Sequence, residues 1–358
     1  MEQSKRKVAL PRYAEYNCGM KYILEKGLDV QCIMPPKLTK RTLELGAQNS
    51  PDFVCTPFKT ILGNQIEALE AGADTLIMSY GLCKLGYFGE LEEKILRDMG
   101  YQFDFINMSK YDTGKKKDLL KVIKEINPKV KPAKFAVAAA EAVRMTEYVD
   151  EITGDYYCNR AFAVNKKAYD TIYRHFLAGM YAAGSKHDIE QCYHEAKLAL
   201  AGAELDKPAR PIRVGIVGEF YTAMDEFSNL EVEKKLTDLG VEVHRWMTVT
   251  NRMLRYPGDN NLQVQIKDYS SYNMGCNTTS NVWAALDYVK RGFDGVIHIK
   301  SANCTPEIDA MTALKSISND YQVPFLYLTF DVQTSDVGLQ TRLEAFYDML
   351  AMRKRVLK

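Results

Sequence analysis

One short pattern occurs twice in this chain of 358 residues: a helical segment, a Gly-x-Asp turn, an apolar strand and then a cysteine. In the first half, Gly72–Met78 (GADTLIM) is followed by Cys83. In the second half, Gly292–His298 (GFDGVIH) is followed by Cys304. The cysteine comes nine residues after the aspartate in the first half and ten residues after it in the second. The repeat indicates that one architecture is used twice.

Around this repeat, short apolar strands alternate with helical patterns, which is typical of parallel sheets with crossover helices. A chain of this length also fits two domains. We therefore predict an α/β protein with two Rossmann-like (flavodoxin-like) domains and mainly parallel sheets, plus a helical insert. The expected domains are residues 1–133 and 210–358, with the helical insert and a linker at 134–209. The expected strands are residues 7–10, 30–34, 74–79, 103–107, 213–217, 242–246, 295–299 and 324–329.

The charges are balanced, with 47 Lys and Arg against 46 Asp and Glu, so the chain has no excess of cations to neutralise a nucleic-acid backbone. The charged start of the chain does not have the apolar region of a secretory signal. The longest apolar runs fall far short of the roughly 20 residues that a membrane helix needs. We expect a cytoplasmic protein that binds neither nucleic acid nor membrane.

The chain has eight cysteines, and the reducing cytosol favours thiols or metal ligands over disulfides. No Cys-x-x-Cys pair occurs, so any metal site must be assembled from distant segments. In open α/β sheets, ligands bind beyond the carboxyl ends of the strands, where we expect Cys83 and Cys304.

Cys55 and Cys304 each precede Thr-Pro, and a proline in the first turn predicts that both cysteines lie at helix N-termini. The helix dipole there stabilises a thiolate. A single cysteine is more often an inert core residue than a ligand. Cys55, Cys83 and Cys304 are expected to lie in similar loops of two domains. Together they make a soft-metal or iron–sulfur centre as well supported as three inert thiols. The residue pattern leaves both interpretations open.

Several longer stretches carry a resemblance to a known family. They are Lys40–Gly46, Cys55–Lys59, Gly63–Asn64 before Glu67–Leu69, Gly218–Tyr221, Asp294–His298, Cys304–Ile308 and Thr341–Leu350. Along nearly its whole length the chain resembles the 2-hydroxyacyl-CoA dehydratase and benzoyl-CoA reductase component family, particularly its short branch of CoA enzyme activase-related proteins.

This resemblance implies a [4Fe-4S] cubane in the cleft between two Rossmann-like domains, bound by Cys55, Cys83 and Cys304 and leaving one iron open. Some relatives hold two cubanes bridged by sulfide. It also implies a partner ATPase that carries its own cluster and delivers low-potential electrons, and a substrate of the acyl-CoA class or another small molecule. We therefore expect an iron–sulfur reductase or dehydratase component that forms a homo- or hetero-oligomer.

The sequence departs from the family pattern in four stretches near the expected cleft, so the substrate stays undefined. These stretches are Tyr80–Gly86, Met274–Thr279, Ser301–Asn303 and Asp331–Val332. Two other functions stay open: a non-catalytic iron–sulfur electron-transfer or accessory protein, and a metal-free protein that binds a small molecule.

Further residues have two interpretations each. Cys18 and Cys276 would add ligands for a bridged cluster or be isolated thiols, whereas core or surface roles are favoured for Cys32, Cys158 and Cys192. His298 is expected to be a hydrogen-bonded core histidine rather than a proton donor. Glu307 would complement a helix dipole. Lys59 and Lys84 would stabilise a reduced cluster or be solvated surface lysines.

Overall fold

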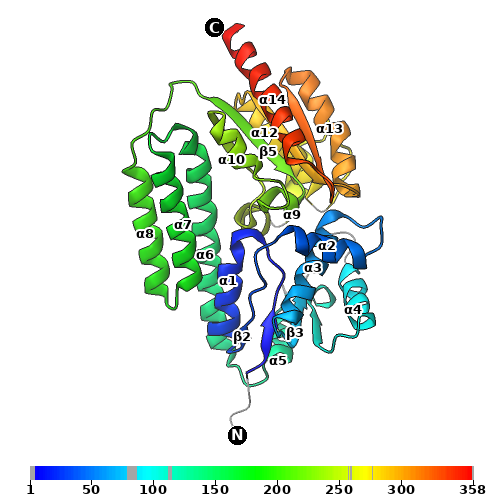
Figure 1. The fold of residues 1–358 in the computed structure, drawn as a ribbon. Helices are drawn as coiled ribbons and strands as arrows, with labels where there is room; N and C mark the ends of the chain where they lie inside the picture. Colours follow the sequence, from blue (N-terminus) through cyan, green and yellow to red (C-terminus); the bar gives the residue numbers. More distant parts are fainter. Residues whose placement is uncertain are drawn as a thin grey trace. The chain divides into compact units, whose positions relative to one another are not determined.

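The computed structural model describes residues 5–78, 87–111, 115–256, 258, 260–275 and 277–356. The chain forms two compact units, Met1–Thr146 with Gly179–Glu190, and Glu147–Ala178 with Gln191–Lys358. Each unit contains one sheet of four parallel strands. The predicted α/β fold with two Rossmann-like domains and a set of additional helices is therefore confirmed (Figure 1).

The first unit contains a parallel sheet in the order β2-β1-β3-β4. Its strands are β1 (Lys7–Ala9), β2 (Gln31–Cys32), β3 (Thr75–Met78) and β4 (Asp104–Asn107). Its helices are η1 (Ala14–Tyr16), α1 (Asn17–Tyr22), η2 (Ile23–Gly27), α2 (Lys40–Asn49), α3 (Thr56–Glu70), α4 (Phe88–Asp98), η3 (Met108–Lys110) and α5 (Lys116–Ile126). Val8, Ile77 and Ile106 bring three of the strands into one hydrophobic core with Leu24 and Val122 from the helices.

The second unit repeats this topology with the order β6-β5-β7-β8, again entirely parallel. Its strands are β5 (Ile212–Gly218), β6 (Val241–Arg245), β7 (Gly295–Ser301) and β8 (Phe325–Phe330). Its helices are α9 (Phe220–Met224), α10 (Val232–Asp238), η5 (Thr250–Arg255), α11 (Asn260–Gln265), α12 (Thr278–Lys290), α13 (Thr305–Tyr321) and α14 (Asp336–Val356). Both sheets follow the flavodoxin-like order 2-1-3-4, which confirms that one architecture is used twice.

The aspartate of each Gly-x-Asp turn has the same structural role. In the first unit, the backbone N–H of Lys7 donates to the Asp74 carboxylate (3.0 Å), and the Asp74 N–H donates to the Lys7 carbonyl (2.9 Å). In the second unit, the N–H of Arg213 donates to Asp294 (2.8 Å), and the Asp294 N–H donates to the Arg213 carbonyl (2.9 Å). Each aspartate therefore fastens the start of its own strand to the neighbouring central strand.

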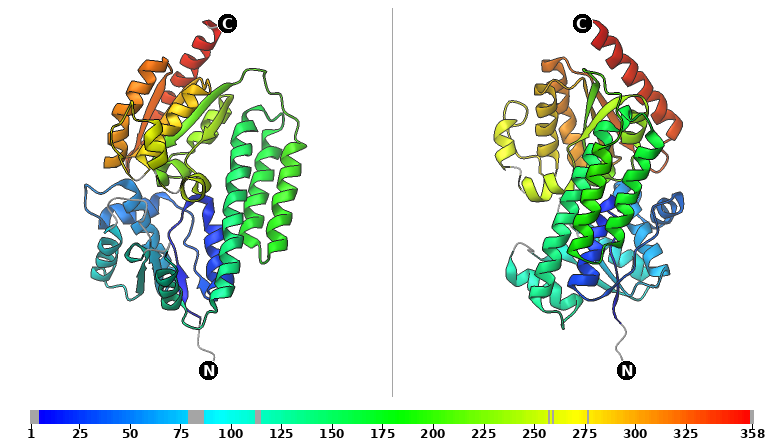
Figure 2. Two further views of the ribbon diagram at one scale, coloured as in Figure 1. Left: turned by 180° about the vertical axis from the view of Figure 1, so that it is seen from behind. Right: turned by 90° about the vertical axis from the view of Figure 1, so that its left-hand side faces the viewer.

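Helices cover both faces of the second sheet. A Cβ atom on Gly215 of β5 would lie 2.3 Å from the Tyr288 ring of α12, so only glycine allows this helix to approach the strand. A Cβ atom on Gly295 of β7 would lie 2.8 Å from the Phe346 ring of α14. Figures 1 and 2 show α12 and α13 on one face of the sheet and α14 on the other.

The predicted helical insert is confirmed as three long helices side by side (Figure 2). They are α6 (Pro132–Asn159), α7 (Lys166–Ala182) and α8 (Lys186–Ala201), with η4 (Arg160–Phe162) after α6. The buried Arg160 forms ion pairs with Asp170 of α7 (2.8 Å) and Asp238 of α10 (2.6 Å). Losing both carboxylates would leave the buried Arg160 charge uncompensated, so these ion pairs fix the end of α6 to α7 and α10. Among the helices in the described ranges, none combines the length and apolar character required to cross a bilayer.

Candidate functional site

Cys55 is the N-cap residue of α3 in the first unit. Its carbonyl accepts the N–H of Lys59 at 3.4 Å, and Pro57 occupies the first turn of the helix. The cysteine is partly exposed. These observations confirm the predicted position at a helix N-terminus, where unpaired backbone N–H groups and the helix dipole favour a thiolate.

Close packing of α2 against α3 positions Cys55. A Cβ atom would lie 1.6 Å from the Lys59 carbonyl oxygen if Gly46 were alanine, and 1.8 Å from the Thr42 carbonyl oxygen if Gly63 were alanine. The two helix backbones are therefore in direct contact. The buried Thr42 hydroxyl also donates to Glu67 Oε2 at 2.8 Å, which holds the same pair of helices together.

Cys304 is the N-cap residue of α13 in the second unit, just beyond the carboxyl end of β7. The Ile308 N–H donates to its carbonyl at 3.2 Å, and Pro306 stands in the first turn. Asn303 turns the chain from strand to helix with a left-handed φ of 63°, a conformation that asparagine tolerates better than most residues. The position predicted from the Thr-Pro motif is confirmed.

Cys55 and Cys304 thus share one local structure: a partly exposed N-cap cysteine followed by Thr-Pro and a long helix. They belong to different units. The other predicted ligand, Cys83, lies outside the described residues, as do Cys276 and Lys84. Within the ranges that the structure describes, no three His, Cys, Asp or Glu side chains come together as a metal site. The predicted ligand set of Cys55, Cys83 and Cys304 therefore stays a prediction.

Among the remaining described cysteines, one is buried and three, Cys32, Cys158 and Cys192, are partly exposed. Cys18 is buried in α1. Burial raises the pKa of Cys32 to about 12 and the pKa of Cys192 to about 11. Cys158 donates to the Val243 carbonyl at 3.5 Å, and burial raises its pKa to about 12. A raised pKa keeps a thiol protonated and inert at neutral pH. Structural roles for Cys32, Cys158 and Cys192 agree with their sequence interpretation.

A buried polar network lies close to the Cys304 helix. His298 of β7 is fully buried, and its Nε2 atom is hydrogen-bonded to Glu307 Oε2 at 2.7 Å. Asn281 of α12 donates to Glu307 Oε1 and to the Gly218 carbonyl, both at 2.8 Å. The prediction of a hydrogen-bonded core histidine is confirmed. Glu307 is in the first turn of α13 as predicted, but it is buried and bound to two other elements.

A second carboxylate, Glu219, lies at the end of β5. It caps α9 by accepting the N–H groups of Tyr221 (2.7 Å) and Thr222 (2.8 Å). Burial raises the pKa of Glu219, while the hydrogen bonds from Thr222 and Tyr221 oppose that rise. The carboxyl edge of the second sheet therefore holds two carboxylates that are engaged by protein donors.

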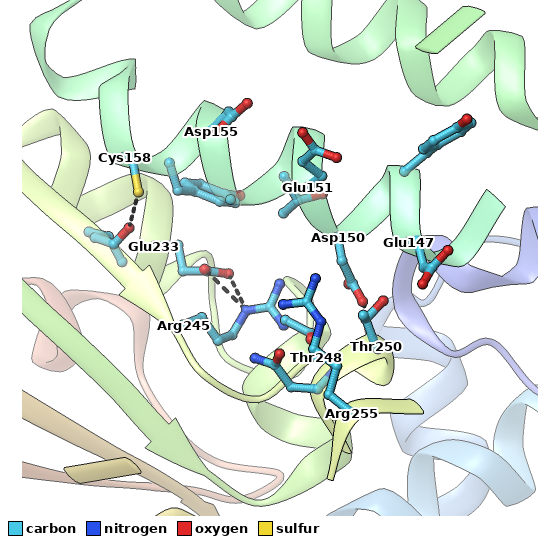
Figure 3. Close-up of a pocket in the computed structure, with 16 residues that line it drawn as sticks. Glu147, Asp150, Glu151, Asp155, Cys158, Glu233, Arg245, Thr248, Thr250 and Arg255 are labelled. Atoms are coloured by element: carbon cyan, nitrogen blue, oxygen red, sulfur yellow. Dashed lines mark hydrogen bonds and ion pairs between the residues drawn. The ribbon is translucent and has the colours of Figure 1, made fainter. Parts of the chain in front are cut away.

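A cavity of about 570 Å³ opens elsewhere in the second unit, between α6 and the edge strand β6 with its following segment (Figure 3). On the strand side, Glu233 holds Arg245 through two contacts of 3.1 Å. On the helix side, Asp150 accepts the N–H of Thr250 at 2.8 Å. Cys158 lines this cavity and Cys304 does not. The cavity has the size of a small-molecule site, yet its lining is strongly acidic.

The sequence interpretation missed this acidic lining. Four carboxylates follow one another at helical spacing along the second half of α6, and Figure 3 shows them spaced along the helix: Glu147, Asp150, Glu151 and Asp155. Residues three or four apart share a helix face, so this spacing is a signal that the sequence contains. Only the tertiary structure shows that β6 lies opposite this face.

Lys59, for which the sequence leaves open either a role beside a reduced cluster or a solvated position, donates to the Asp52 carbonyl at 3.1 Å.

No family model matches this sequence, and no curated protein is significantly similar to it. The resemblance to the dehydratase component family therefore stays a prediction that depends on the motifs themselves.

Proposed function

We propose that this chain is an iron–sulfur protein resembling 2-hydroxyacyl-CoA dehydratase components. In this proposal Cys55, Cys83 and Cys304 bind the cluster, and a partner ATPase with its own cluster supplies low-potential electrons for the reduction or activation of a small-molecule substrate. The observation that carries it is the shared local structure of Cys55 and Cys304, each the N-cap residue of a long helix that begins with Thr-Pro.

The donor chemistry supports this proposal. Thiolates are the preferred ligands of iron–sulfur centres, and a helix N-terminus lowers the free energy of the thiolate form. Both cysteines are partly exposed, in contrast to the buried Cys18. When bound, a cluster of this kind accepts and passes on single electrons.

The surrounding residues have two roles in this proposal. The packing of Gly46 and Gly63 between α2 and α3 fixes the direction of the Cys55 helix, so the ligand needs little reorganisation on binding. The network of His298, Glu307 and Asn281 fixes the first turn of the Cys304 helix in the same way.

Anaerobic iron and sulfide analysis, combined with electron paramagnetic resonance of the reduced protein, tests this function. We expect about four irons per chain for one cubane and about eight for a bridged pair. Each of the single variants Cys55→Ala, Cys83→Ala and Cys304→Ala should have a lower iron content and a changed spectrum. Cys192→Ala is the matched control, because that thiol is inside the helical layer and donates to the Phe176 carbonyl.

Full iron content in all three ligand variants would refute the assignment of ligands. A colourless wild-type protein without iron or sulfide after anaerobic purification would refute the function itself and favour a metal-free small-molecule-binding protein. A cluster whose spectrum stays unchanged with every acyl-CoA tested would favour an electron-transfer or accessory role.

A further inference from the structure

The N-termini of α12 and α13 lie next to each other at the carboxyl edge of the second sheet. Asn281, in the early part of α12, contacts both Glu307 in the first turn of α13 and the Gly218 carbonyl at the end of β5, at 2.8 Å each. Gly218 pairs with Ile299 of β7. The first turns of two long helices, with their positive dipole ends, therefore flank the ends of the two central strands.

Lys300 lies at this edge and is almost buried, with only 8% of its surface exposed. Side chains alternate along a strand, so Lys300 is on the same face of β7 as His298, one step nearer the carboxyl edge. His298 contacts Glu307, which shows that this face is the one covered by α13. Lys300 therefore lies on the face of the sheet that α13 covers, at the end of β7 nearest the helix N-termini.

The Lys300 ammonium group has no ion pair or hydrogen bond with any residue of the described ranges. The ammonium group is not among the fully buried side-chain atoms that have no partner, so it keeps contact with solvent. A cation at the positive ends of two helices is repelled by both dipoles, and an anion bound there would offset this repulsion. The neighbouring carboxylates are already engaged: Glu307 by His298 and Asn281, and Glu219 by the first turn of α9. The Lys300 ammonium group is therefore open to an external anion.

The start of α12 supplies a second, independent sign of a ligand. Five consecutive polar residues there are at most 5% exposed: Asn277, Thr278, Thr279, Ser280 and Asn281. Thr279, Ser280 and Asn281 use their side chains in hydrogen bonds within the unit. The hydroxyl of Thr278, the first residue of the helix, is fully buried and has no hydrogen-bond partner among the described residues.

The same helix start carries another buried cation. Arg252 of η5 is 6% exposed and donates from Nε to Asn277 Oδ1 at 2.6 Å. This contact holds a guanidinium group at the N-cap of α12. The charge at this position adds to the positive end of the helix, and together they favour a negatively charged group there.

We propose that the carboxyl edge of the second sheet binds an oxyanion, the carboxylate or phosphate group of a small molecule, through Lys300, the Thr278 hydroxyl and the N–H groups that follow Thr278 in the first turn of α12. Arg252 is a positioning residue that orients the helix start and adds long-range charge. Because Cys304 caps the adjacent helix α13, the oxyanion anchors its molecule beside that cysteine. The oxyanion site does not depend on a cluster and is tested without one.

The experiment uses the full-length, metal-free protein and two probes, inorganic phosphate and acetate, at constant ionic strength maintained with chloride. Calorimetric titration should show saturable binding of at least one probe, and comparison of the two distinguishes a phosphate site from a carboxylate site. Lys300→Met should weaken binding at least tenfold. Thr278→Val should weaken it by a smaller factor, because it removes one neutral donor. The matched control is Lys290→Met at the opposite, exposed end of α12, which should bind like the wild type.

A second readout shows whether the Lys300 variant is folded and separates a binding role from a structural one. Removing a cation from the positive ends of two helices should raise the urea midpoint of the ligand-free second unit, whereas added phosphate or acetate should raise the midpoint of the wild type alone. Absence of saturable binding to both probes, wild-type affinity in Lys300→Met, or a lower midpoint in ligand-free Lys300→Met would overturn the proposal. An equal midpoint shift with chloride at matched ionic strength would reduce it to screening and overturn it as well.

Discussion

Removing Asp294, the aspartate of the second Gly-x-Asp turn, should lower the free energy of unfolding of the second unit. The structure allows this loss to be divided between a hydrogen bond and an ion pair. Asp294 accepts the Arg213 N–H at 2.8 Å and forms an ion pair with Lys354 of α14 at 2.6 Å. Asp294→Ala removes both interactions. Asp294→Asn retains an acceptor for the N–H group and loses the charge. Lys354→Met removes the ion pair together with the hydrogen bond from Lys354 Nζ to the Pro211 carbonyl (2.6 Å).

The two interactions differ in expected magnitude. A hydrogen bond from a backbone N–H to a carboxylate contributes about 1.5–3 kcal/mol. The ion pair contributes at most about 1 kcal/mol, because its two side chains are 23% and 21% exposed and partly screened. We therefore expect a decrease in the free energy of unfolding of about 2–3 kcal/mol for Asp294→Ala. A smaller decrease, of about 1–2 kcal/mol, is expected for Lys354→Met, which also loses its hydrogen bond to the Pro211 carbonyl. Asp294→Asn should cost less than Asp294→Ala.

Urea unfolding followed by tryptophan fluorescence measures these free energies for the second structural unit. The chain has two tryptophans, Trp246 and Trp283, and both are in the second unit. Asp74→Ala is the matched variant, because Asp74 has the same role in the first unit. It should alter the circular-dichroism transition and change the fluorescence transition less.

Two results would refute this reasoning. If Lys354→Met were as destabilising as Asp294→Ala, the contacts of Lys354 with Asp294 and the Pro211 carbonyl, rather than the bond from Asp294 to the strand, would be the important interactions. If Asp294→Ala left the unfolding free energy within about 0.5 kcal/mol of the wild type, it would match an ordinary surface substitution, and the repeated aspartate would have no structural role.

Three further predictions follow from the same structure. Hydrogen bonds from His244 and Lys207 outweigh burial and lower the pKa of Glu242 from 4.5 to about 2, so its stabilisation is complete above pH 4.5 and lost as the pH falls through 2. In acid-unfolding curves, the free energy of unfolding should therefore fall less between these pH values in Glu242→Gln than in the wild type, by on the order of 3 kcal/mol. An unchanged curve would contradict the pKa shift. Burial raises the pKa of Cys158 to about 12, so mass spectrometry should find it unmodified by iodoacetamide at pH 8 until the chain unfolds, and rapid native labelling would contradict that burial. Gly63→Ala places a Cβ atom 1.8 Å from a backbone oxygen and should lower the circular-dichroism midpoint of the first unit, whereas an unchanged midpoint would show that the helices can separate at low cost.

Much of the fold was predictable because its signals are local. Parallel strands buried on both faces are short apolar runs, and the turns before β3 and β7 carry the same Gly-x-Asp motif. The structure confirms both, with Asp74 and Asp294 bonded to the start of their neighbouring strands. Thr-Pro after Cys55 and Cys304 correctly predicted helix N-termini, because proline fixes the backbone of the first turn without regard to distant residues.

The sequence by itself therefore determined the succession of strands and helices along the chain, the repeated α/β architecture and the local conformation of two cysteines. The tertiary structure alone decided which polar groups are buried together. His298 and Glu307 are nine positions apart and form a pair only because β7 and α13 pack face to face. Lys300 has no distinguishing neighbour in the sequence, and its almost complete burial follows from the helices that cover its face of the sheet. Burial and charge pairing depend on residues distant in the chain, whereas turns and helix caps depend on residues a few positions apart.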